Sequence, residues 1–480
     1  MRRWAAVLAL LATGCTSLEP KYVRPDSAVP ASWPIGDSYL VAAEAGLPAL
    51  TYRQVFTDPR LQTLIAQGIA NNRNLMTAAA NIAAAREQYR IQRAQQLPQL
   101  NASAGATTTG KDSQFQAGLQ VPSFEVDLFG RLRSLTHAEQ ARYFATEAGA
   151  RATRLTLVAN IAGAWLSYAA DSSLLLIAEQ TVASAEKSVR LTRLRLEGGI
   201  APRTDLRQAE QILSIAQADL AQQRTARAQD VNALQLLIGS PVAPSLLPGS
   251  IDEAFGTIVP VQPGLDSYVL LRRPDVIHAE YQLRAANADI GAARAALFPR
   301  ITLTGLLGFA SSALGALFTG GAFAWQAGAD ATYTIFQGGA GHANVRLSEA
   351  QRRAAIATYQ GAIQTAFREV GDALARRGTI NDEIAARQRQ QAATADTYTL
   401  TELRYRAGVD PYLNVLSAQQ SYYSAQNTVV AIKQTAAQNI VDLYQAIGGD
   451  ALLQATPICQ PLPGDSSASN AKLASQCSPM

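Results

Sequence analysis

The sequence predicts a mainly α-helical protein with an internal two-fold repeat and four β-strands. Three observations carry this prediction. The segment LRLEGGIAPRTDLRQAEQ at 194–211 returns as LRYRAGVDPYLNVLSAQQ at 403–420, about 209 positions later. A helical pattern of roughly 65 residues precedes each copy. Each half also contains one stretch with strand-like alternation. A repeated helical hairpin constrains the architecture strongly, so we expect a pseudo-symmetric helical body.

The first 14 residues are typical of a lipoprotein signal peptide. Arg2 and Arg3 give a basic start, and residues 4–12 form an apolar run too short to span a bilayer. The run ends at Gly14-Cys15, although Ala12 stands where lipoproteins usually carry Leu. We expect a lipid on Cys15, the alternative being ordinary cleavage with a free thiol. Residues 15–57 lack helical periodicity and predict an extended N-terminal tether.

Residues 58–240 form the first predicted repeat. Its strands, at about 100–109 and 114–129, are indicated by Thr and Gly and by alternating apolar residues, which are Phe115, Ala117, Leu119 and Val121. Its predicted helices and turn are a helix at 58–96 that ends at Leu97-Pro98, a helix at 134–198, a hairpin tip at about 198–204 and a helix at 203–239.

Residues 271–449 form the second repeat, after a linker at 241–270. Phe298-Pro299 matches Leu97-Pro98, and TIFQGG around Phe336 matches DLFG around Phe129. The predicted elements are a helix at 274–297, strands at about 300–309 and 324–336, a helix at 342–406, a tip at about 407–412 and a helix at 412–448. The uncharged run between the strands resembles a membrane helix, but six glycines interrupt it and favour strands and turns.

The long helices show a coiled-coil pattern. Each 65-residue helix would be about 100 Å long, more than a globular domain needs. In the last helix, apolar residues recur at three- and four-residue steps with Asn439 as the one polar member; they are Val415, Ala418, Tyr422, Ala425, Val429, Ile432, Ala436, Leu443 and Ala446. In the helix at 203–239, Gln223, Arg227 and Asp230 break the corresponding seam.

Composition excludes several functions. The net charge of +4 is too small to hold nucleic acid. No Cys/His spacing suggests a metal, and no nucleophile–base pair or phosphate loop indicates an enzyme or a cofactor. The tail at 450–480 is polar and predicts disorder. Its Cys459 and Cys477 are consistent with a disulfide in an oxidising compartment or with two free thiols.

Four strands per chain raise the question of sheet edges. An open four-stranded sheet beside such long helices would leave both edges unpaired. A closed barrel removes edges and is the β structure that spans lipid. Four strands are too few for a pore, so more than one chain must contribute.

The chain resembles the TolC-like outer-membrane efflux proteins, in the OprM/NodT branch of lipoprotein channels. The residues that carry the resemblance are CTSLEPKYVRP from Cys15, the segment RRPDVIHAEYQLRAANADIGAARAALFPRITLTG and both glycine hairpin turns. The resemblance covers about 15–449. It implies a homotrimer with a twelve-stranded outer-membrane barrel and an α-helical coiled-coil barrel in the periplasm. It also implies two partners, a periplasmic adaptor and an inner-membrane transporter of the RND type.

The resemblance further implies a periplasmic aperture closed near the hairpin tips. Thr204, Asp205 and Tyr405 match positions of the closing network. Asp410 falls where some relatives carry an arginine that pairs with the first-hairpin aspartate, so that lock would here join two acids. Arg203 or Arg406 could substitute as partner. The alternative role of Asp205 is to stabilise a helix N-terminus through the dipole.

The remaining carried-over positions concern the pore and the docking tips. Leu413 matches an apolar constriction. Asn414 and Ser417 fall where relatives often place acidic rings, so the cation preference of such rings is in doubt here. Gly198, Gly199 and Gly408 are turn glycines that the resemblance assigns to adaptor docking.

The resemblance implies a passive exit duct for drugs or other small toxic molecules. Two alternatives stay open, an exit duct for secreted polypeptides and a structural coiled-coil lipoprotein without a pore. The paired strand segments argue against the second, because a scaffold does not need them.

Overall fold

A computed structural model describes residues 17–25, 29–30, 51–110, 112–260 and 267–449. The described residues divide into two compact units. The strand unit lies within 1–27, 79–149 and 275–362, and the hairpin unit lies within 28–78, 150–274 and 363–480. Helices α4, α5 and α9 contribute residues to both units. Cys15, Cys459 and Cys477 lie outside the described residues.

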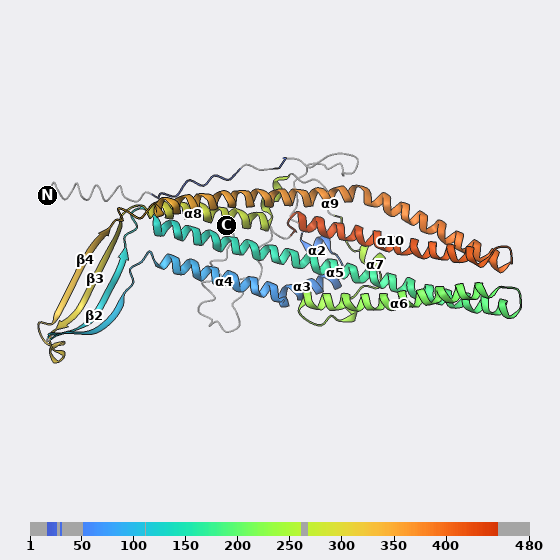
Figure 1. Cartoon of the computed structure of the whole chain (residues 1–480), viewed down its shortest axis with the longest axis horizontal. Coiled ribbons are helices and arrows are strands. Elements are labelled where there is room, and N and C mark those ends of the chain that lie inside the picture. Colours follow the sequence, from blue (N-terminus) through green and yellow to red (C-terminus); the bar gives the residue numbers. More distant parts are fainter. Residues whose placement is uncertain (1–16, 26–28, 31–50, 111, 261–266, 450–480) are drawn as a thin grey trace. The chain divides into compact units, whose positions relative to one another are not determined.

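The elements follow the predicted order (Figure 1). In chain order they are α2 (Tyr52–Val55), α3 (Pro59–Asn71), α4 (Arg73–Ala94), β1 (Asn101–Thr109), β2 (Asp112–Glu125), α5 (Arg131–Glu197), α6 (Arg203–Ile238), η1 (Pro244–Leu246), α7 (Ile251–Phe255), η2 (Ser267–Arg272), α8 (Pro274–Ala295), β3 (Arg300–Ser311), η3 (Leu314–Ala316), β4 (Phe323–Thr332), α9 (Ala340–Arg406) and α10 (Tyr412–Ala446).

The strand unit contains one antiparallel sheet with the order β1-β2-β3-β4. Two predicted strand ends were too long. β4 stops at Thr332 instead of 336, because its partner β3 begins at Arg300, opposite Thr332. β2 stops at Glu125 instead of 129, because the chain turns there and the Asp127 carboxylate accepts the backbone N–H of Arg133 at 2.8 Å.

The two faces of this sheet differ in polarity. The register places one apolar set on a single face: Ala117, Leu119, Val121, Leu303, Leu307, Phe309, Phe323, Trp325 and Ala327. The opposite face carries mainly polar side chains and glycine: Gln114, Gln116, Gln120, Thr302, Thr304, Gln326 and Asp330. Trp325 is 72% exposed, and Leu307 is 53% exposed. An apolar sheet face that lacks a covering layer is typical of strands that contact lipid.

The N-terminal segment 17–25, in the range predicted as an extended tether, contains no helix and lies along α8 in the strand unit. The Arg24 guanidinium forms three hydrogen bonds at 2.8, 3.0 and 3.2 Å with the buried Glu280 carboxylate. Further along α8, the Asn287 side chain donates to the Pro20 carbonyl at 2.7 Å. A Cβ at Gly291 would lie 2.7 Å from the Glu19 Cα, so only glycine leaves room for the segment here.

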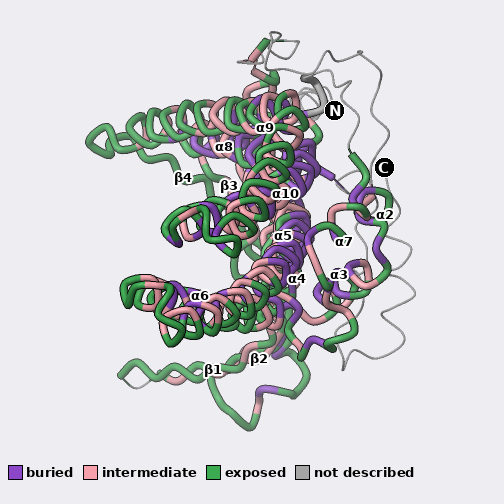
Figure 2. Tube along the Cα trace, turned by 90° about the vertical axis from the view of Figure 1, so that its right-hand side faces the viewer, coloured by how far each residue is buried: buried purple, intermediate pink, exposed green. Residues whose placement is uncertain are grey.

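The hairpin unit is built around two helical hairpins, α5–α6 and α9–α10. Buried residues concentrate on α5 and α10, whereas α6 is largely exposed (Figure 2). Every predicted seam residue of α10 is buried except Tyr422, which is half-buried and stacks on Tyr398 with ring centroids 6.1 Å apart. Among the described residues, α5 alone is long and apolar enough to cross a membrane; half of its apolar window is buried, as in a core helix.

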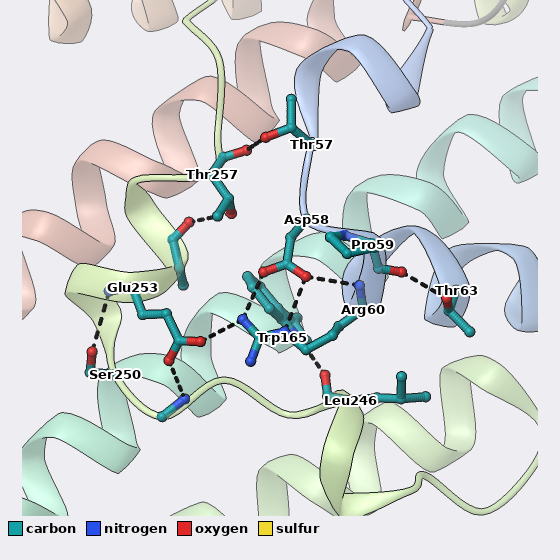
Figure 3. A network of polar contacts seen from close by, with 12 residues as sticks. Thr57, Asp58, Pro59, Arg60, Thr63, Trp165, Leu246, Ser250, Glu253 and Thr257 are labelled. Atoms are coloured by element: carbon teal, nitrogen blue, oxygen red, sulfur yellow. Dashed lines mark hydrogen bonds and ion pairs between the residues drawn. The ribbon is translucent and has the colours of Figure 1, made fainter.

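A smaller cluster in the same unit joins the N-terminal helices to the linker at 241–270. The sequence did not predict it. Arg60 forms ion pairs with Asp58 at 2.7 Å and with Glu253 at 2.6 Å, above the buried Trp165 (Figure 3). The Trp165 indole N–H donates to the Leu246 carbonyl at 3.0 Å. This cluster makes 241–260 a packed segment with its own helices.

The single helix predicted at 58–96 is interrupted at Asn72. Its side chain donates to the Leu237 carbonyl at 2.7 Å and accepts the Leu75 N–H at 3.1 Å. An asparagine that serves both neighbouring helix ends favours a break over a continuous helix.

Candidate functional site

The hairpin tips share one turn geometry. Gly199 and Gly408 have φ values of 72° and 79°, in the left-handed region that favours glycine. The residue after each glycine donates to the carbonyl five positions earlier, at 2.9 Å in both hairpins. These are the glycine-centred helix ends that the sequence predicted. A Cβ at either glycine would meet open space, so both turns are exposed.

An aromatic cluster joins the two hairpins behind the turns. Tyr405, at the end of α9, and Tyr412, at the start of α10, are buried with ring centroids 5.3 Å apart. They pack with Val189, Ala209 and Val415. Burial raises the pKa of Tyr412 to about 12, so this phenol is neutral at physiological pH. Tyr412 had been assigned to the exposed tip, and its burial corrects that boundary.

Arg195, near the hairpin tips, makes contacts that the sequence did not reveal. Its guanidinium lies 4.6 Å from the Tyr405 ring centroid. It also donates to the carbonyls of Tyr405 at 3.1 Å and Arg406 at 3.4 Å. A cation that hydrogen-bonds the C-terminal carbonyls of α9 is favoured by the helix dipole. Arg195 therefore links the end of α5 to the end of α9.

Asp410 pairs with an arginine of its own hairpin. Arg404 pairs with it at 2.6 and 3.1 Å within the same hairpin, and Arg406 pairs instead with Glu402. The hydrogen bonds from Arg404 lower the pKa of Asp410.

Arg404 and Arg195 occupy matching positions of the repeat, 209 residues apart, yet their contacts differ. Arg404 is held by Asp410, whereas the position that matches Asp410 in the first hairpin is Ala201. Without a local carboxylate, Arg195 contacts the other hairpin.

Asp205 lies in the first turn of α6, where the helix dipole favours an acidic residue. Burial raises the pKa of Asp205, and the charge of Arg195 opposes this shift. Asp205 is thus close enough to Arg195 to sense its charge. Its position is consistent with both predicted roles, one in the gate and one at the helix N-terminus. Thr204, beside it, is exposed.

The predicted constriction residues share the exposed surface of α10. Leu413 is 57% exposed, and Asn414 and Ser417 are also exposed. Positions 414 and 417 fall on one helix face. This face carries amides and hydroxyls instead of carboxylates, and the described residues contain no group of three or more potential metal ligands.

Paired helical hairpins together with a sheet that has one apolar face define the class of channel subunits that cross an outer membrane and extend beyond it. A sequence model of the outer membrane efflux protein family matches residues 64–240 and 266–449. The chain belongs to this family.

Curated relatives agree with this assignment. The chain is 39% identical over 458 residues to the probable efflux pump outer membrane protein TtgC of Pseudomonas putida, covering 92% of this chain and 94% of that protein. It is 39% identical over 463 residues to the outer membrane protein OprJ of Pseudomonas aeruginosa, covering 93% and 95%. It is 36% identical over 453 residues to the cation efflux system protein CusC of Escherichia coli O157:H7, covering 92% and 97%.

Solved structures show the same architecture. The open state of the MtrE outer membrane channel of Neisseria gonorrhoeae matches with a TM-score of 0.83 at 34% identity, covering 91% of this chain and 99% of that one. A structure of CusC matches with a TM-score of 0.81 at 35% identity, covering 90% and 100%. The chain is therefore an outer-membrane efflux channel protein that extends into the periplasm.

Proposed function

We propose that this chain forms a homotrimeric exit duct that expels small toxic organic molecules. Three copies supply twelve strands for a barrel in the outer membrane, and their hairpins form a helical barrel in the periplasm. An adaptor docks at the exposed turns around Gly198, Gly199 and Gly408, and an RND-type transporter drives export. A lipid on Cys15 adds a second membrane attachment.

The sheet is the observation that carries this proposal. Its order leaves β1 and β4 as edges, and the strands alternate in direction, so β4 of one copy can continue antiparallel onto β1 of the next. None of the described residues covers its apolar face. Both the free edges and the bare face are satisfied when several copies close a ring in lipid.

The aperture residues give the duct a closing device. Arg195 holds the end of α9 against α5, and the Tyr405–Tyr412 cluster fills the space behind it. Opening then requires this contact to break while each hairpin keeps its own turn. The uncharged Asn414 and Ser417 favour a passage without a strong preference for cations.

The cargo proposal rests on relatives. A protein of Pseudomonas putida that is 39% identical is named as a toluene efflux pump component, and another is named as an antibiotic efflux pump component. For this chain we propose drugs and apolar organic molecules as cargo. The transporter selects the cargo, so the duct needs only a passage of sufficient width.

Three measurements test the proposal. Purified protein in detergent should have the mass of three chains. A strain that lacks the gene should regain drug resistance only when it expresses a functional copy of this chain. A photoreactive residue at Val409, which is 63% exposed, should capture a periplasmic adaptor; the buried Tyr412 is unsuitable as a probe. A monomer in detergent, or capture of cell-wall proteins alone, contradicts the duct. Capture of a peptide-exporting system would change the cargo to polypeptides.

A further inference from the structure

The strand unit contains two sequence-matched junctions between strands and helices, and they differ in exposure. At the first, Phe129 is partly covered and Phe298 is 46% exposed, whereas the matching residues of the second are 87% and 69% exposed. The first joins the end of β2 to the start of β3, and the second comprises the end of β4 and the start of β1. In the repeat, Phe129 matches Phe336, and Phe298 matches Leu97.

The first junction closes within the chain. Phe129, after β2, stacks on Phe298, before β3, with ring centroids 4.6 Å apart and an interplanar angle of 21°. The backbone N–H of Val126 donates to the Ile301 carbonyl at 2.9 Å and continues the β2–β3 pairing to this point. As a result Val126, Leu128 and Phe129 are all partly covered.

The matching residues of the second junction are bare. Phe336 is 87% exposed and Ile335 is 90% exposed, after β4. Leu97 is 69% exposed and Leu100 is 65% exposed, before β1. Phe336 matches Phe129 and Leu97 matches Phe298, and Phe129 and Phe298 pack on each other. Two exposed apolar residues with these counterparts indicate that they form a second contact of the same kind. They flank opposite edges of one sheet, so they cannot meet within the chain.

We infer that Phe336 of one copy packs on Leu97 of the next copy and seals the junction between neighbouring chains, as Phe129 on Phe298 seals the junction within a chain. This inference rests on the proposed closed ring. The intrachain register, with Glu125 opposite Thr302, places Thr332 opposite Asn101 of the adjacent copy. The occupant of this surface is therefore a second copy of this chain.

One difference separates the two junctions. Within the chain, Arg300 lies 3.4 Å from Glu125 beside the aromatic stack. The matching residues between copies are Gln99 and Thr332, which are uncharged. The contact between copies is therefore apolar, and its strength should not depend on salt.

Disulfide trapping tests the inference. In a Cys459→Ser/Cys477→Ser background, the pair Leu97→Cys/Phe336→Cys should give covalent dimers and trimers in membranes after mild oxidation, since the inferred register places positions 97 and 336 directly opposite each other, where β-carbons come closest. Either single variant should give no ladder. The matched control, Phe129→Cys/Phe298→Cys, should cross-link within the chain and remain a monomer on a denaturing gel.

The outcomes separate two failures. If the unmodified protein is trimeric and the control pair closes, but Leu97→Cys/Phe336→Cys gives no more ladder than the single variants, the contact is refuted while the duct stands. If the unmodified protein is monomeric, the proposed function fails first. Quantitative labelling of Phe336→Cys by a lipid-phase thiol reagent in the trimer would also overturn the contact, because it would assign this residue to lipid.

A second variant tests the contact by a gain. Gln99→Arg/Thr332→Glu copies the intrachain ion pair into the junction between copies. The variant trimer should resist heat in detergent at a higher temperature than the parent at low salt, and this gain should fall at 1 M salt. No change in trimer heat resistance at low salt would contradict the placement of these positions.

Discussion

The two long hairpins have the same length and the same turns, yet they are packed differently. Three positions that break the seam of α6, Gln223, Arg227 and Asp230, match three seam residues of α10 in the repeat. Those counterparts are all buried: Ile432, Ala436 and Asn439. α10 buries sixteen residues and α6 five. α10 is thus a packed helix, whereas the buried residues of α6 lie near its two ends.

The difference shows how a repeat can keep its backbone and divide its tasks. Asn439 donates to the Ala373 carbonyl at 3.0 Å and fixes the register of α9 against α10. Its counterpart Asp230 hydrogen-bonds Asp171 across α5 and α6, and burial followed by the Asp171 charge raises the pKa of Asp230 to about 7. The same repeat position sets register in one hairpin and holds a proton in the other.

The largest effect should come from placing the arginine of α6 at the matching position of α10. Ala436 of α10 is fully buried, and its counterpart in α6 is Arg227, so the variant is Ala436→Arg. We expect a loss of about 4 kcal/mol or more, because the guanidinium has no partner there. Folded trimer should vanish from heat-modifiability gels. The reciprocal Arg227→Ala should leave the trimer intact, and comparable loss in both variants would refute the contrast.

A second prediction concerns the matched arginines at the tips. Arg195→Ala removes the hydrogen bonds to the α9 carbonyls, worth about 1.5 to 3 kcal/mol for a charged donor. We expect a single-channel conductance several-fold above that of the parent in planar bilayers. Ala201→Asp should act in the same direction, since it offers Arg195 the local carboxylate that Arg404 already has. Unchanged conductance in both variants would exclude Arg195 from the gate.

The third prediction uses pH. The pKa of Asp230 is about 7 in the folded protein and 3.8 for an ordinary aspartate. Between these pH values the folded state holds a proton that the unfolded chain releases. Stability should therefore fall as pH rises from about 4 to about 7. Asp230→Asn should flatten this dependence and raise the melting temperature at pH 8 by a few degrees. Asn439→Asp, its mirror change, should introduce a new dependence. If the stability of the parent protein does not change with pH in this window, the pKa of Asp230 is not raised in the fold.

The smallest effects should be equal in both hairpins. Gly199→Ala and Gly408→Ala each force a side chain into the left-handed region without meeting neighbours. We expect a cost of about 1 kcal/mol for each, measured by thermal unfolding. A much larger cost at one site would reveal a contact that the matched turn geometry does not contain.

The sequence could predict what local patterns determine. Glycine positions located both tips, and alternation placed four strands to within a few residues, because these signals are local. The role of Arg195 was hidden because it depends on carbonyls 210 positions away and on Ala201 standing where the other hairpin has Asp410. The break at Asn72 depends in the same way on the distant Leu237 carbonyl. Contacts between the two repeats cannot be predicted from hydrophobic periodicity, because periodicity describes each helix by itself.

The attachment of the N-terminal segment to α8 has a consequence for the order of export. Arg24 leaves the translocation machinery early, but its partner Glu280 follows 256 positions later. The contact between this segment and α8 can therefore form only after more than half of the chain has crossed the inner membrane.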